Sequence, residues 1–219
     1  LYDAVKEAGV ADPQADMHFL FRGRDGDIEA ITAAASGLTK RILSSRSNRY
    51  DTSAIVDNDS EYNYRLRFQN SYANTSENII LFDDLENYQK DGRSSDWKGT
   101  LKAIDFSALP KDKNGAMLIS PVVYYSTEAQ NFDGKTAPDL TAWKKLDLRN
   151  NGSVPEELQK DIRAIAIDLS KTPDGAVYSL GKGEAVSVNL TMTAPSGAAR
   201  ADGTAGYPET YNGILASYD

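Results

Sequence analysis

Residues 61–69, Glu-Tyr-Asn-Tyr-Arg-Leu-Arg-Phe-Gln, decide the fold class of this chain. Apolar and polar side chains alternate strictly through the stretch, so that every second side chain falls on the same face. That face carries Tyr62, Tyr64, Leu66 and Phe68. Such alternation is typical of an antiparallel strand with one face in the core and the other toward water. The stretch therefore predicts a sheet with one buried face.

Short runs of the same kind recur along the chain, separated by residues that favour turns. They fall at residues 17–22, 38–43, 79–82, 100–106, 120–126, 162–169, 185–193 and 211–216. One short helix is predicted for residues 155–161, where Pro155 opens the segment and acidic residues follow it. Strands do not alternate with helices, and there is no internal repeat. The pattern predicts an all-β fold, a β-sandwich of about ten short antiparallel strands.

The composition narrows the function classes. The chain has 219 residues, 40% of them apolar and 26% charged, which is ordinary for a globular protein. Its 24 basic and 32 acidic residues give a net charge of −8, so it lacks the basic surface that nucleic acids or anionic membranes attract. No apolar run is long enough for membrane insertion. With no Cys and one His, His18, thiolate and multi-His metal sites are excluded. This inventory predicts a binding or structural module, not an enzyme, without metal or cofactor.

Three segments in a fixed order carry a resemblance to a known family. Lys40 stands in an early strand, and the Tyr-x-Tyr strand follows it. The next apolar strand ends in Asp83-Asp84-Leu85, and Asn212 stands in the last strand. The ordered set resembles the immunoglobulin-like repeat and stalk domains of Gram-positive cell-wall-anchored surface proteins, which include collagen-adhesin A-type and pilin domains.

This resemblance covers residues 38–219 and implies an immunoglobulin-like β-sandwich there. Residues 1–37 would be the end of a preceding domain or an added strand. The resemblance also implies an extracellular protein, anchored to the cell wall through regions outside this chain. Its partners would be neighbouring domains of the same surface protein, and a host glycan or matrix protein.

Many members of the family form an internal Lys–Asn isopeptide bond. By resemblance, the bond here would join Lys40 to Asn212, with Asp83 as the assisting acid. A lysine amine attacks only when neutral, and burial among apolar side chains favours the neutral form. Burial likewise favours a protonated aspartate, which can hydrogen-bond to the amide carbonyl and polarise it. Asp84 is the alternative acid, and Asn189 is a weaker partner because it alternates onto the outer face of its strand.

Two other function classes stay open at this level. The first is a loop-based module that binds a glycan or host protein without a cross-link, through residues 86–99 and 127–153. Its candidate ligand-binding residues are Trp97 and Trp143, although such aromatic residues more often pack in a core. The second is a hydrolase, for which no pair of carboxylates at a fixed separation stands out. The structural or adhesive module is therefore the favoured prediction.

Overall fold

The computed structural model describes residues 17–22, 27–32, 37–87, 94–130, 132, 136–200, 203 and 207–219. The strands, in chain order, are β1 Met17–Arg22, β2 Asp27–Thr32, β3 Thr39–Ser44, β4 Glu61–Gln69, β5 Ile80–Asp83, β6 Thr100–Asp105, β7 Val122–Ser126, β8 Lys144–Lys145, β9 Ala164–Asp168, β10 Ala185–Thr193 and β11 Ile214–Ser217. Two single-turn 3₁₀ helices are described, η1 Leu140–Ala142 and η2 Asn150–Gly152.

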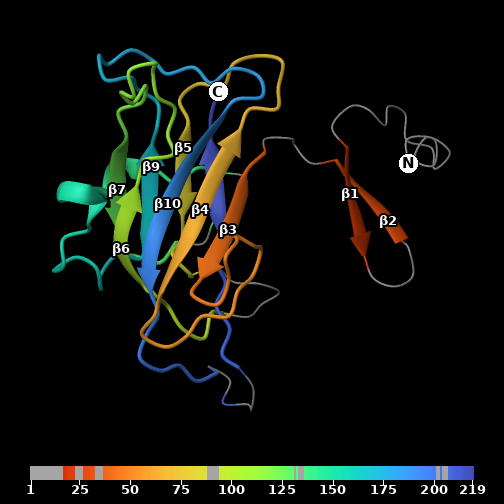
Figure 1. Cartoon of the computed structure of the whole chain (residues 1–219), viewed down its shortest axis with the longest axis vertical. Coiled ribbons are helices and arrows are strands. Elements are labelled where there is room, and N and C mark those ends of the chain that lie inside the picture. The colour runs from red at the N-terminus through yellow and green to blue at the C-terminus, as the bar shows by residue number, and fades with distance from the viewer. Residues whose placement is uncertain are drawn as a thin grey trace.

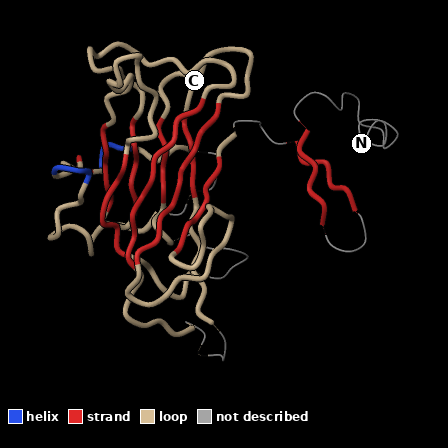
Figure 2. Tube along the Cα trace, viewed as in Figure 1, coloured by secondary structure: helices blue, strands red, loops and turns tan. Residues whose placement is uncertain are grey.

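The strands of the main body form two antiparallel sheets (Figures 1 and 2). One has the order β3-β4-β10-β6 and the other the order β11-β5-β9-β7-β8. Side chains from both sheets pack into one hydrophobic core, so the predicted all-β sandwich is confirmed. Strands β1 and β2 pair with each other in a separate two-stranded sheet. They lie within the segment 1–37 that the sequence analysis set apart from residues 38–219.

The alternation in β4 has the predicted structural effect. Tyr62, Leu66 and Phe68 are fully buried, and Tyr64 is nearly so. Strand β10 lies beside β4 with Leu190 opposite Tyr64, and its own alternate residues are buried too. Burying apolar surface yields about 25 cal/mol per Å², so these two central strands contribute much of the stability of the sandwich.

The five-stranded sheet departs from simple alternation, because its outer face is covered as well. Ala164 and Ala166 in β9 are as buried as Ile165 and Ile167. Next to Ala166 in the sheet, Phe82 packs edge-on against Trp143 and Phe132, with ring centroids 6.2 Å apart in both pairs. Strand β9 is therefore buried on both faces, which the sequence pattern did not reveal.

The short helix predicted for residues 155–161 is wrong. The segment forms successive turns, with Leu158 N–H donating to Pro155 O and Asp161 N–H donating to Leu158 O. Seven residues offer too few helical hydrogen bonds to offset the cost of helix nucleation. Among the described residues, no helix has the length and apolar character to span a membrane.

Candidate functional site

The candidate site lies between the two sheets, where core-facing positions carry polar residues instead of apolar ones. In β3, Lys40 shares its face with Ile42 and Ser44, which are both buried. In β5, Asp83 shares its face with Leu81, a core residue. Side chains two apart in a strand point the same way, so Lys40 and Asp83 face each other across the sandwich.

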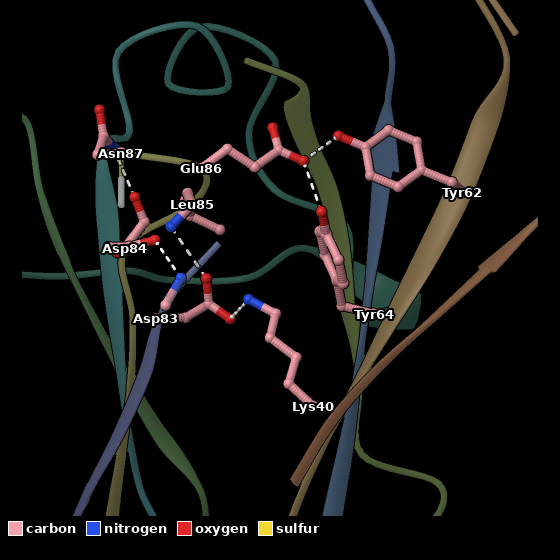
Figure 3. Close-up of polar contacts among 9 residues, drawn as sticks. Lys40, Tyr62, Tyr64, Asp83, Asp84, Leu85, Glu86 and Asn87 are labelled. Atoms are coloured by element: carbon pink, nitrogen blue, oxygen red, sulfur yellow. Dashed lines mark hydrogen bonds and ion pairs between the residues drawn. The ribbon is translucent and has the colours of Figure 1, made fainter. Parts of the chain in front are cut away.

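The two side chains form an ion pair that joins the sheets (Figure 3). Lys40 Nζ lies 2.5 Å from Asp83 Oδ2, with Asp83 fully buried and the Lys40 side chain 10% exposed. The other oxygen, Asp83 Oδ1, accepts a hydrogen bond from Leu85 N–H at 2.9 Å. The ring of Tyr64 completes the lysine's surroundings, with Nζ 4.3 Å from the ring centroid. Both oxygens of Asp83 are thus acceptors of hydrogen bonds.

Asn212 reaches the same region from the segment before β11. Strand β11 pairs with β5 so that Ile214 lies opposite Asp83, and Asn212 precedes Ile214 by two positions. Ile214 packs against the core. Both polar atoms of the Asn212 amide are buried, and neither makes a hydrogen bond of ordinary length and angle with the described residues. A weaker side-chain hydrogen-bonding interaction of Asn212 with Tyr64 acts to lower the pKa of that tyrosine, which puts the amide close to the residue whose ring flanks Lys40.

A tight turn after β5 brings two further acids into the site. Leu85 and Glu86 have positive φ angles of 46° and 72°, values that cost free energy for residues other than glycine. This turn buries Asp84 and Glu86 completely. Asp84 Oδ1 accepts a hydrogen bond from Gly213 N–H at 2.9 Å, whereas Asp84 Oδ2 is buried without a partner among the described residues.

Glu86 connects the turn to the other sheet (Figure 3). Its Oε1 accepts hydrogen bonds from the hydroxyls of Tyr62 and Tyr64, at 2.5 and 2.9 Å. Its Oε2 accepts one from Gly99 N–H. Burial, followed by the charge of Glu86, raises the pKa of both tyrosines well above the usual value, so both hydroxyls keep their protons and donate. The glutamate therefore fixes the tyrosine ring that lies beside Lys40.

Two acids of the site, Asp84 and Glu86, hold protons more tightly than exposed carboxyls do. Burial, and then the neighbouring charge of Asp83, raises the pKa of Asp84 to about 7. Burial also raises the pKa of Glu86, against the effect of its three hydrogen-bond donors. One amine, one amide and three carboxyls thus share a buried region with a proton available for exchange. No group of side chains suited to a metal ion occurs in the part of the chain that is described.

The structure brings Lys40, Asp83 and Asn212 into one region. Sequence reasoning missed Glu86 and the roles of Tyr62 and Tyr64 as its donors. The signal was present in the core-facing Tyr-x-Tyr pattern, because a buried tyrosine hydroxyl needs a hydrogen-bond partner.

The two tryptophans and the weaker candidates lie elsewhere. Trp97 is half-buried and packs edge-on against Tyr62, with ring centroids 6.0 Å apart. Trp143 is half-buried and lines a shallow cavity beside Tyr125, Glu128 and Lys144. Asn189 is hydrogen-bonded to Arg65 and Asp105 on the outer face of the four-stranded sheet, away from the core.

Comparisons with known proteins give little further information. No family model matches the chain, and no curated protein matches it. A solved structure described as "AvmM Catalyzes Macrocyclization in Alchivemycin A Biosynthesis" is similar over 90% of this chain and 94% of that one, with 11% identity and a TM-score of 0.28. That protein is an enzyme, so this finding runs against the prediction that the chain is not an enzyme, and the prediction is withdrawn. A likeness this weak carries no argument about the chemistry of this chain.

Proposed function

We propose that this chain is a structural or adhesive module of a bacterial cell-surface protein, stabilised by a self-formed isopeptide bond between Lys40 and Asn212. The location at the cell surface rests on the family resemblance. The bond is supported by one observation above all. The Lys40–Asp83 pair bridges the two sheets inside the core, and the Asn212 amide is buried next to Tyr64, the residue whose ring flanks Lys40, without a hydrogen bond of ordinary geometry to the described residues.

The reaction needs only the side chains of the site. Asp83 accepts one proton from the Lys40 ammonium at its 2.5 Å contact, which leaves a neutral amine. The amine nitrogen attacks Asn212 Cγ, and the bond from Cγ to Nδ2 breaks. The second amine proton passes to Nδ2, which leaves as ammonia. No redox step or cofactor is required, and folding supplies the proximity that makes such an intramolecular reaction fast.

The bond would change how the sandwich responds to force. Lys40 lies in β3 of one sheet, and Asn212 precedes β11 of the other. Tension applied at the two ends of residues 40–212 would pass through the covalent link instead of the strands between. Such a link suits a stalk or adhesin domain that must withstand shear and proteases, and neighbouring domains of the same protein would be its natural partners.

The intact mass of the purified, denatured protein tests the proposal. We expect a deficit of one ammonia in the wild type. The deficit should disappear in Lys40→Ala and in Asn212→Ala. Lys145→Ala and Asn189→Ala are the matched controls, because both residues lie in strands outside the site, and both variants should keep the deficit. An unmodified wild-type mass would refute the cross-link. A deficit of one water would show that Lys40 is bonded to a carboxyl group instead of to Asn212.

A second function is supported by the cavity at Trp143. Tyr125 and Trp143 give it apolar walls, while Glu128 and Lys144 supply charged groups, and aromatic surfaces with polar rims suit sugars. Most of the lining residues of this cavity fall in the region 127–153, and Tyr125 and Ser126 come from strand β7. A glycan array should then give a saturable hit that Trp143→Ala abolishes. The Trp97→Ala variant is the control, because Trp97 packs against Tyr62 instead.

A further inference from the structure

The two neighbouring aspartates, Asp83 and Asp84, have different environments in the site. Both oxygens of Asp83 already accept hydrogen bonds, one from Lys40 and one from Leu85 N–H. A carboxyl in this position can receive a proton from the amine, but it has no free oxygen with which to donate toward Asn212. A separate group is therefore needed to polarise the amide carbonyl.

Asp84 has the free oxygen that Asp83 lacks. Its Oδ1 accepts from Gly213 N–H, which fixes the carboxyl against the residue that follows Asn212. Its Oδ2 and the carbonyl oxygen of Asn212, Oδ1, are both buried and make no hydrogen bond of ordinary geometry with the described residues. Buried polar atoms without partners are costly, and a cluster of them needs an explanation. Two acceptors, a carboxylate and a carbonyl, cannot pair with each other, whereas a protonated carboxyl and a carbonyl can.

We infer that protonated Asp84 donates a hydrogen bond from Oδ2 to Asn212 Oδ1 and stabilises the negative charge that develops there, while Asp83 acts only as the proton acceptor for Lys40. This inference rests on the proposed function and assigns the acid of that reaction. Asp84 ends the reaction in the protonated form in which it began. Its proton is hydrogen-bonded to Asn212 Oδ1 in the intermediate and remains on Asp84 when the carbonyl re-forms. A preorganised donor of this kind is the usual way in which proteins stabilise an oxyanion.

Burial and the charge of Asp83 leave a substantial share of Asp84 protonated near neutral pH. Burial and the adjacent Asp83 raise its pKa, whereas Gly213 N–H, Lys40 and the backbone N–H of Glu86 act in the opposite direction. Lys98, from the segment before β6, also interacts with Asp84 and Glu86. Since the proton of Lys40 moves to Asp83 within the site, the reaction releases no proton to solvent before the attack. Its pH dependence should therefore follow Asp84.

The test starts from unreacted chain that has been recovered unfolded in urea. The chain is refolded at a series of pH values from about 5 to about 9, a range that spans the titration of such a carboxyl. The loss of ammonia is followed over time by intact mass. The wild-type rate should fall about tenfold for each pH unit above the pKa of Asp84, the slope for loss of one required proton. Asp84→Asn keeps an oxygen for Gly213 N–H and puts a weaker amide N–H donor, which does not titrate, in place of the acidic O–H. It should react about a hundredfold more slowly, without that slope.

Asp147→Asn is the matched control, since the Asp147 side chain is 86% exposed and lies far from the site in the sequence. It should keep the wild-type rate and slope. Circular dichroism checks that Asp84→Asn folds, and the wild-type profile decides the question if it does not. A wild-type rate that rises with pH, or an Asp84→Asn rate equal to wild type, would overturn the role of Asp84 and leave the proposed function intact. Absence of ammonia loss from the wild type at every pH would refute the proposed function and this inference together.

Discussion

Replacing Asn212 with alanine removes the proposed bond and leaves Lys40 and Asp83 in the ion pair of the unreacted chain. The bond would close a loop of 212 − 40 = 172 positions. By the loop-entropy relation used for disulfides, closing a loop of this length stabilises the fold by about 5 kcal/mol. A domain of this size exposes enough surface for a urea dependence of about 2.5 kcal/mol per M. The midpoint of urea unfolding should therefore fall by about 2 M in Asn212→Ala.

Intrinsic fluorescence provides the assay, because Trp97 and Trp143 are half-buried in the folded chain and become exposed on unfolding. Asn189→Ala is the matched control. It removes an asparagine whose hydrogen bonds, to Arg65 and Asp105, lie outside the site. Its cost should be about 1 kcal/mol, the usual net value of such hydrogen bonds.

The reasoning would be refuted if the two asparagine variants shifted the midpoint equally while the wild-type mass showed a loss of ammonia. In that case the bond would form without restricting the unfolded chain. A large shift for Asn212→Ala in a wild type of unmodified mass would instead assign the stability to packing around the amide.

Three further predictions concern the fold and the buried acids. Gly152→Ala should unfold at a much lower urea concentration than Gly115→Ala. Both glycines have positive φ, but a Cβ at Gly152 would lie 2.1 Å from Ile104 O, whereas a Cβ at Gly115 would have no heavy atom of the described residues within 4 Å, its chain neighbours aside. Equal midpoints would contradict this. Glu86→Gln should cost about 1–3 kcal/mol in urea titrations, because its amide nitrogen would meet a hydrogen-bond donor, and an unchanged midpoint would argue against the network. The pKa of Asp84 is about 7 in the folded chain and near 4 in an unfolded chain, so the folded state binds this proton more tightly. The stabilisation by the protonated carboxyl is therefore complete below about pH 4 and is lost as the pH rises to about 7. Asp84→Asn should remove this slope from the urea midpoints, and a slope that persists would contradict the assignment.

The sequence was sufficient to predict most of the strands because their signal is local, although it did not indicate β2 or β8. Strict alternation in residues 61–69 predicts which side chains enter the core, and the structure follows it residue by residue. The same parity places Lys40 and Asp83 on inward faces, although neither residue is apolar. Their meeting across the sandwich depends on how two separate sheets pack, so it came only from the ordered motif and not from periodicity.

The position of Glu86 in the site could not be predicted, because it depends on backbone conformations for which the sequence carries no signal. Leu85 and Glu86 adopt positive φ without a glycine to signal the turn, and that turn is what buries Glu86 beneath Tyr62 and Tyr64. The packing of Trp143 on Phe82 in β5 was hidden for a similar reason, since it is a loop contact between residues far apart in the sequence.

A buried ion pair among further carboxyls is a poor way to stabilise a sandwich. Well-packed apolar residues in its place are often neutral or more stabilising, because the charges lose their hydration on burial. The proposed reaction removes this cost. As the amine becomes an amide, ammonia leaves neutral and the proton of Lys40 stays on Asp83. A buried ammonium and carboxylate are thus replaced by a neutral amide and a neutral acid. The opposite charges of Lys40 and Asp83 would therefore attract the two side chains during folding and be neutralised when the bond forms. The mature core would hold one fewer ion pair and one covalent link between its sheets.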